Sequence, residues 1–196
     1  MTNDSNASSP EPTSPSDSPT PVEVEPEASS VPAEPDYSDC TILIVDDNAQ
    51  NVELLQAYLE TDALPCRIAT ACDGIDALAM IDDPNEPTPD VILLDIMMPK
   101  MSGYEVCRKL KEDPSTRSIP IIMVTALNEL GDIERGVECG TDDFLTKPVN
   151  KLELITRVKS LLRVRHLKKE FDRAMAYIQD MKDKPGEGTG RIDPVD

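Results

Sequence analysis

The sequence lacks several features that would assign it to a common class of protein. No stretch approaches the roughly 20 consecutive apolar residues that a membrane span requires, so we expect no membrane partner. No basic segment followed by an apolar one opens the chain, so no secretory signal is predicted. Only 19 Lys and Arg stand against 38 Asp and Glu, a net charge of -19. Because like charges repel, this balance argues against DNA or an anionic membrane surface as a partner.

The chain also lacks a CxxC pair, although it contains five cysteines. An odd number of cysteines without that spacing, and without an export signal, is typical of reduced thiols in the cytoplasm. No His or Cys is placed where a zinc site would need it. We therefore expect a cytoplasmic protein without a zinc site.

Composition divides the chain into four segments. Residues 1–38 are rich in Ser, Pro, Glu and Asp and carry no Lys or Arg. Such a segment cannot bury enough apolar surface to offset its chain entropy, so we predict a disordered acidic tail. Residues 39–163 have the patterning of a folded domain. A helical extension is predicted over 164–184, and a flexible tail over 185–196.

Strand and helix signals alternate through the folded segment. Short apolar runs bounded by polar residues predict strands, and apolar residues on one helical face predict helices between them. Five such units with short connections predict a flavodoxin-like, doubly wound α/β fold: a five-stranded parallel sheet of order 2-1-3-4-5 with helices on both faces. The strands are expected at Ile42–Val45, Cys66–Ala71, Val91–Leu94, Ile119–Val124 and Asp143–Thr146, with Asn48 and Asp73 beginning helices and Gly140 ending one.

A long helix is expected from about Asn150. Its first part presents an apolar face suited to packing on the sheet, formed by Leu152, Ile155, Val158 and Leu162. A second set of apolar residues then follows a 3-4-3-4-3 spacing, which is typical of a heptad seam: Val164, Leu167, Phe171, Ala174, Ile178 and Met181. The seam runs for under three heptads, so its stability alone would be marginal. Two interpretations stay open, a solvated helical tail or a signal-transmitting contact that includes a possible homodimer through 164–181.

Polar residues follow the apolar runs at what should be one edge of the sheet. Asp46 and Asp47 follow the first strand, and Asp95 closes the third. Open α/β sheets carry their chemistry at the carboxyl ends of the strands, so we expect these acids to lie close together. The first two acids alone could be a helix N-terminal pair favoured by the helix dipole. The third acid favours a site for Mg²⁺, which prefers oxygen ligands.

Two further side chains complete the set. Lys147 follows the fifth strand, and its ammonium can pair with Asp95 at rest and with a phosphate oxygen after transfer. Thr125 follows the fourth strand and offers a hydroxyl that can donate to a phosphoryl oxygen. The bond between Lys147 and Pro148 is the kind of peptide bond at which cis geometry occurs. Together these residues predict phosphoryl chemistry on Asp95.

Motifs in five stretches match one known family in order and spacing. They are Ile42–Asn48, Asp90–Pro99, Met101–Glu105, Val124–Ala126 and Gly140–Pro148. On these motifs the chain, from about Thr41 to Leu162, resembles the receiver domain of two-component response regulators. The stretches Cys107–Lys111, Asp113–Pro114 and Leu161–Arg163 look most like receivers that precede diguanylate cyclase or sensor-kinase modules.

The resemblance implies a role for each polar residue of the site. Asp95 would accept a phosphoryl group from a histidine kinase or phosphotransfer protein. Mg²⁺ would be held by Asp46, Asp47 and Asp95 together with the backbone carbonyl of Met97. The protein would then be a phosphoacceptor without separate substrate turnover, rather than an enzyme.

The resemblance also implies a switch. Lys147 and Thr125 would bind the phosphoryl oxygens, and the Thr125 hydroxyl would move inward to do so. Phe144 stands at the aromatic switch position of the family and would turn into the vacated space. As Phe has no hydroxyl, packing alone would hold its inward state.

We expect no output domain after Leu162, since neither a helix-turn-helix block nor a Gly-Gly-Asp/Glu-Glu-Phe motif follows. Phosphorylation would then change contacts with an unidentified downstream protein. The alternative is a phosphate-independent adaptor with the same fold, which the complete set of site residues disfavours. A phosphatase with an Asp nucleophile would want a second acid two residues later. Asn48 follows Asp46 at that distance and Met97 follows Asp95, so this pattern fails.

Overall fold

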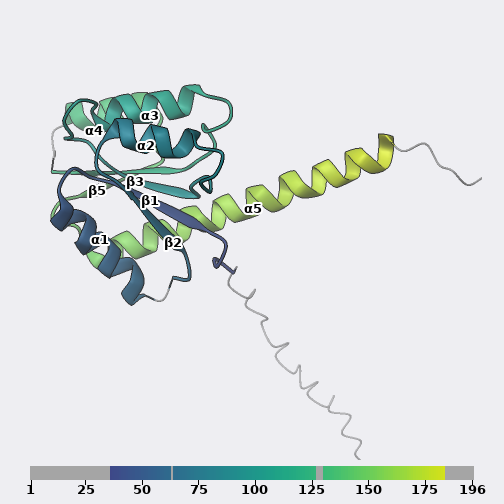
Figure 1. Ribbon diagram of the computed structural model, residues 1–196, viewed down its shortest axis with the longest axis horizontal. Coiled ribbons are helices and arrows are strands. Elements are labelled where there is room, and N and C mark those ends of the chain that lie inside the picture. Colours follow the sequence, from purple (N-terminus) through teal and green to yellow (C-terminus); the bar gives the residue numbers. More distant parts are fainter. Residues whose placement is uncertain (1–35, 63, 127–129, 184–196) are drawn as a thin grey trace, which may run out of the picture. The chain divides into compact units, whose positions relative to one another are not determined.

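The computed structural model describes residues 36–62, 64–126 and 130–183. Five strands alternate with five helices along this part of the chain (Figure 1). Their bounds are β1 Thr41–Val45, α1 Ala49–Thr61, β2 Arg67–Ala71, α2 Gly74–Asp82, β3 Val91–Asp95, α3 Gly103–Glu112, β4 Ile121–Thr125, α4 Leu130–Cys139, β5 Asp143–Thr146 and α5 Lys151–Asp183.

The strands form one parallel sheet in the order β2-β1-β3-β4-β5, which confirms the predicted doubly wound fold. In register, Val45 lies beside Leu94, and Asp95 lies beside Val124. The residues that follow β1, β3, β4 and β5 therefore meet at the carboxyl edge. The predicted fourth strand began two residues early. It starts after Pro120, whose ring leaves no N–H for the ladder.

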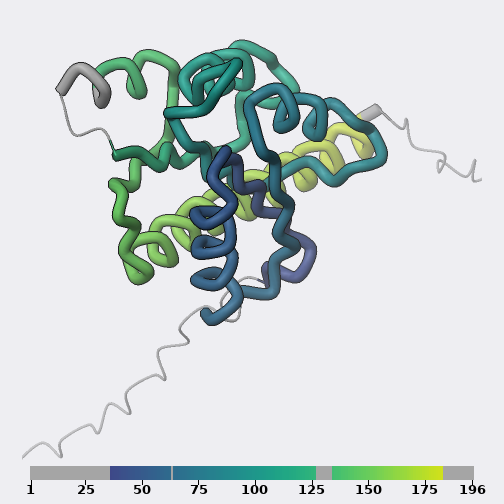
Figure 2. The backbone as a smooth tube through the Cα atoms, turned by 60° about the vertical axis from the view of Figure 1, so that its left-hand side comes forward, coloured from purple at the N-terminus to yellow at the C-terminus, as the bar shows by residue number. Residues whose placement is uncertain are grey.

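The helices cover both faces of the sheet, and each face has its own core. Helices α2, α3 and α4 lie on one side, and α1 and α5 lie side by side on the other (Figures 1 and 2). Strands β1, β3 and β4 are buried throughout, as expected for central strands covered on both faces. This double cover fixes which side chains remain at the edges.

The predicted helix boundaries at Asn48, Asp73 and Gly140 are confirmed, and Ser102 adds a cap that was not predicted. The Asn48 side chain accepts from the backbone N–H of Gln50 at 2.9 Å and begins α1. Asp73 caps α2 in the same way, and Ser102 begins α3 with a capping box. Gly140 has φ +85°, a left-handed conformation that ends α4. The three N-terminal caps mark where α1, α2 and α3 begin after the strands that precede them.

One part of the predicted face of α5 is wrong. Leu152 is 76% exposed, whereas Leu154 is fully buried with Ile155, Val158 and Leu162. At 3.6 residues per turn, Leu152 lies roughly 100° from the centre of the buried stripe. Choosing Leu154 from the sequence would have required knowledge of how α5 is rotated against β5 and β3.

Helix α5 continues without a break past Leu162 to Asp183, and all six seam residues are exposed. The predicted end segments, 1–38 and 185–196, lie almost entirely outside the described residues. Tyr37, near the end of the first of them, is buried in the core between α1 and α5. Within the described part of the chain, no helix combines the length and apolar character needed to cross a bilayer.

A buried ionic contact, here called the basal clamp, ties α5 to the edge of the sheet opposite the site. It joins Asp90, the residue just before β3, to Arg165 and Lys169. Asp90 Oδ2 accepts from the Thr41 backbone N–H at 3.1 Å, while Oδ1 lies in ion-pair contact with Lys169 and 3.7 Å from Arg165 Nε. Arg165 also donates to the carbonyl and hydroxyl oxygens of Ser118, at 3.0 and 2.7 Å.

Candidate functional site

Three carboxylates converge where β1 and β3 end. Asp46 and Asp95 are nearly buried, at 3% and 5% exposure, and Asp47 is exposed. Each offers an oxygen atom, and these atoms lie within 4.8 Å of one another. The convergence predicted from the sequence is thus present, because β1 and β3 are neighbours in the sheet.

The Lys147 ammonium bridges the two buried acids. Its Nζ donates to Asp46 Oδ2 at 2.8 Å and to Asp95 Oδ1 at 2.9 Å. The Lys147 backbone N–H donates to the carbonyl of Thr125 at 2.7 Å, which aligns the end of β5 with that of β4. The Lys147–Pro148 peptide bond is cis.

Burial and charge act in opposite directions on these groups. Burial raises the pKa of the Asp95 carboxyl; the Lys147 contacts act to lower it, and the charges of Asp46 and Asp47 add to the rise. Burial alone would lower the pKa of the Lys147 ammonium, but its contacts with Asp46 and Asp95 outweigh this and raise it. Lysine therefore stays charged at neutral pH and partly neutralises the acids.

This donor set fits a divalent cation. Closely spaced carboxylates are costly without a positive partner, and one ammonium cannot balance three of them. Carboxylate oxygens are the ligands that Mg²⁺ prefers. The residues that would hold it are Asp46, Asp47 and Asp95.

The other predicted site residues lie around this centre. Thr125 is buried at the end of β4, next to Thr146 in the sheet. Met97 follows Asp95 by two residues in the loop after β3, and its side chain is 65% exposed. The use of the Met97 carbonyl as a metal ligand stays a prediction.

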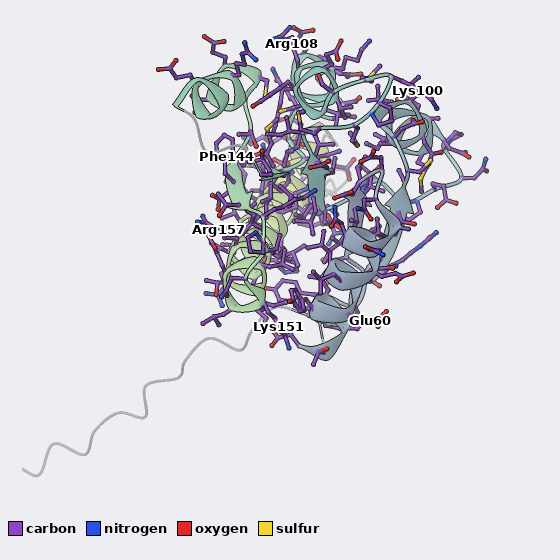
Figure 3. All side chains as sticks on the ribbon, turned by 90° about the vertical axis from the view of Figure 1, so that its left-hand side faces the viewer. Glu60, Lys100, Arg108, Phe144, Lys151 and Arg157 are labelled. Carbon is purple, nitrogen blue, oxygen red and sulfur yellow. The ribbon has the colours of Figure 1, made fainter. Side chains whose placement is uncertain are left out.

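Phe144 is partly buried on the side of the sheet that α4 covers (Figure 3). A Cβ added at Gly136 of α4 would lie 2.3 Å from Phe144 Cζ, far below van der Waals contact. The ring thus rests directly on the backbone of α4, and only glycine leaves room for it. The proposed switch residue is therefore coupled to one particular helix.

The sequence reasoning missed two polar contacts at this edge. The Asn51 amide donates to both carboxylate oxygens of Asp46 at 3.0 Å. Lys100, in the loop after β3, donates to Asp73 Oδ2 at 2.5 Å. A signal for Asn51 existed in its position, one turn into a helix that starts beside Asp46. No comparable signal marked Lys100, because its partner caps another helix.

A family model described as response regulator receiver domain matches residues 42–159. The chain belongs to this family, and it contains a receiver domain of two-component response regulators. The resemblance found in the sequence is confirmed.

Particular relatives extend this result. Response regulator PleD of Caulobacter vibrioides is 51% identical over 122 residues, which are 62% of this chain and 26% of PleD. The phosphate regulon transcriptional regulatory protein PhoB of Pseudomonas aeruginosa is 45% identical over 123 residues, 63% of this chain and 52% of PhoB. The chain thus spans between about a quarter and a half of the length of these relatives.

Solved structures agree with the fold. The signal receiver domain of a signal transduction histidine kinase from Syntrophus aciditrophicus superimposes with a TM-score of 0.58 at 38% identity, covering 64% of this chain and 91% of that one.

Proposed function

We propose that this protein is a phosphorylation-dependent switch in which Asp95 accepts a phosphoryl group from a histidine kinase or phosphotransfer protein. One observation carries the proposal: the Lys147 ammonium bridges the buried carboxylates of Asp46 and Asp95, at 2.8 and 2.9 Å. A resting ion pair of this kind places a cation where a new phosphoryl group would need it.

The transfer is a displacement at phosphorus. An Asp95 carboxylate oxygen forms the new O–P bond while the N–P bond of the donor phosphohistidine breaks, and its electron pair stays on the imidazole nitrogen. Mg²⁺ on Asp46, Asp47, Asp95 and the Met97 carbonyl would neutralise charge on the transferred group. Lys147 exchanges its contact with Asp95 for a phosphoryl oxygen.

The same contacts supply the switch. The Thr125 hydroxyl donates to the phosphoryl group and moves toward Asp95. Phe144 then turns into the space that Thr125 leaves, and the contact of its ring with Gly136 changes. Helix α4 shifts as a result, and the altered surface binds a downstream protein target. The chain acts as a phosphoacceptor with no separate substrate to turn over.

Phosphorylation is tested by incubating the full chain with acetyl phosphate and Mg²⁺. Intact mass should show one added phosphoryl group on the wild type and none on Asp95→Asn, because the amide cannot act as the nucleophile. Size-exclusion elution of the same samples reports any change in oligomeric state.

The control omits Mg²⁺ and adds a chelator, which should suppress modification of the wild type. If the wild type gains no phosphoryl group with Mg²⁺ present, the switch is contradicted and the phosphate-independent adaptor is favoured.

The five cysteines, none of which forms a disulfide, support the cytoplasmic location that such a protein needs.

A second proposal is that two copies pair through residues 164–181. The six seam residues are exposed, while Arg165 and Lys169, which form the clamp, leave the helix on its opposite side. The seam therefore points away from the domain that carries it. Because it spans under three heptads, pairing should be weak and depend on concentration.

Sedimentation equilibrium over a wide concentration range checks the pairing. Phe171→Glu should remove the dimer by placing a charge in the seam, whereas Ala176→Glu, an exposed position off the seam on the same helix, should leave it unchanged. A wild type that stays monomeric at every concentration, with and without acetyl phosphate, would identify the seam as a solvated helical tail.

A further inference from the structure

The proposed chemistry makes no use of Asn51, the third residue of α1. We propose that Asn51 is a positioning residue of the metal site, which holds the Asp46 carboxylate in the orientation that receives a divalent cation. This inference rests on the proposed function, since Asp46 is a metal ligand only there.

The Asp46 carboxylate receives hydrogen bonds from three groups. Oδ1 accepts from the Asn48 backbone N–H at 2.9 Å and from Asn51 Nδ2 at 3.0 Å. Oδ2 accepts from Asn51 Nδ2 at 3.0 Å and from Lys147 Nζ at 2.8 Å. Among the described residues, Asn51 is the side chain that reaches both oxygens.

The three donors differ in what they can fix. The Asn48 N–H makes a local bond over two residues and restrains Oδ1 alone. Lys147 is shared with Asp95 and turns to the phosphoryl group after transfer. Asn51 gives both of its hydrogen bonds to Asp46, so it keeps them when Lys147 exchanges its contact with Asp95 for a phosphoryl oxygen. It therefore keeps Asp46 in place through both states of the site.

The chemistry of the amide suits this role. An amide donor is neutral, so it orients a carboxylate without cancelling the charge that attracts a cation. An ammonium orients the carboxylate and also cancels its charge. Mg²⁺ tolerates little departure from octahedral geometry and is sensitive to ligand orientation. The backbone that carries this amide is held in place, because Asn51 lies in the first turn of α1 and its backbone N–H donates to the Asn48 carbonyl at 3.0 Å.

The position is built by the sequence around it. Side chains on a helix lean toward its N-terminus, and the first turn of α1 starts beside the end of β1. A residue at the third position of that helix reaches back to Asp46, five residues earlier. Partners of this kind, one step removed from a metal, typically change its affinity by about 10–100-fold when they are lost.

The test measures cation binding itself. The full chain is titrated with Mn²⁺, a paramagnetic stand-in for Mg²⁺, and free Mn²⁺ is counted by electron paramagnetic resonance, with Mg²⁺ added as competitor. Asn51→Leu keeps the volume of the side chain and removes its donors. We expect its Mn²⁺ dissociation constant to rise about 10-fold.

The matched control is Gln50→Leu, which makes the same kind of change at the neighbouring, exposed residue of α1. It leaves the hydrogen bonds of Asn48 and Asn51 to Asp46 unchanged, so its Mn²⁺ affinity should equal that of the wild type. Should Asn51→Leu fail to fold, Asn51→Ser replaces it, since a small hydroxyl leaves space for water and the same loss of affinity is expected.

The outcomes separate this inference from the proposed function. If the wild type binds no Mn²⁺, or if Asp47→Asn binds Mn²⁺ as well as the wild type, the metal site of the proposed function is wrong. If the wild type binds Mn²⁺ and Asn51→Leu binds it equally well while its thermal unfolding midpoint falls, Asn51 merely satisfies a buried carboxylate and this inference is overturned.

Discussion

Replacing Lys147 with Met should lower the free energy of unfolding of the metal-free protein by about 3 kcal/mol. The substitution leaves the carboxylates of Asp46 and Asp95, whose side chains are 2% and 6% exposed, facing each other without a cation. Urea unfolding at neutral pH measures the loss. Mg²⁺ should restore part of it, because a bound cation neutralises the same acids.

The destabilisation of Lys147→Met should also depend on pH. The folded-state pKa of Asp95 already lies above the ordinary value of 3.8, and removal of Lys147 would raise it further. A carboxyl with a raised folded pKa favours the native state at low pH, and that contribution is lost as pH rises through the folded pKa. The gap between variant and wild type should therefore narrow on acidification.

Lys151→Met is the matched control, since Lys151 lies in the first turn of α5, four residues further along (Figure 3). It should unfold like the wild type at every pH. An equal loss in both variants would mean that the ammonium of Lys147 contributes nothing particular to the resting site.

Replacing Asp90 with Ala should have a comparable effect at the opposite edge of the sheet, again about 3 kcal/mol. The change leaves the Thr41 N–H without its acceptor and Arg165, whose side chain is 12% exposed, without its acid. Lys169 is 41% exposed and should add little, because water screens it. Urea unfolding gives the size of the effect.

Hydrogen exchange locates the same effect along α5. Amides around Arg165 and beyond should exchange faster in Asp90→Ala, since the basal clamp no longer ties them to the domain. Asp172→Ala removes an exposed acid from the same helix and should leave their exchange unchanged. Equal protection in Asp90→Ala and the wild type would show that the seam region is ordered independently of the clamp.

The sequence was sufficient to predict the fold and the main acids because both follow from local patterns. Buried parallel strands appear as apolar runs, and a polar residue that ends such a run must lie at the carboxyl edge. Asp46, Asp95 and Lys147 could therefore be brought together without knowledge of any distance. Strand order followed from the short connections between units.

Contacts that depend on rotation or on distant segments could not be predicted in this way. Leu152 and Leu154 are both apolar and near the start of α5, and only the packing angle decides which is buried. Asp90 meets Arg165 across a separation of 75 positions, given by their numbers, through an edge that no motif marks. The position of Asn51 in the first turn of α1 makes a contact with Asp46 possible, but the sequence does not give the direction of its amide.

Helix α5 joins a fixed point to a long free arm. The 21 residues from 163 to 183 extend about 30 Å at 1.5 Å per residue, in one unbroken helix. The basal clamp holds this part of the helix near its start, at Arg165 and Lys169, and could serve as the pivot of a tilting motion. A tilt too small to disturb the sheet would sweep the far end of the arm through a much larger arc. A slight rearrangement around Asp95 would in this way become a displacement of the far end of α5 that is large enough to join or separate two chains.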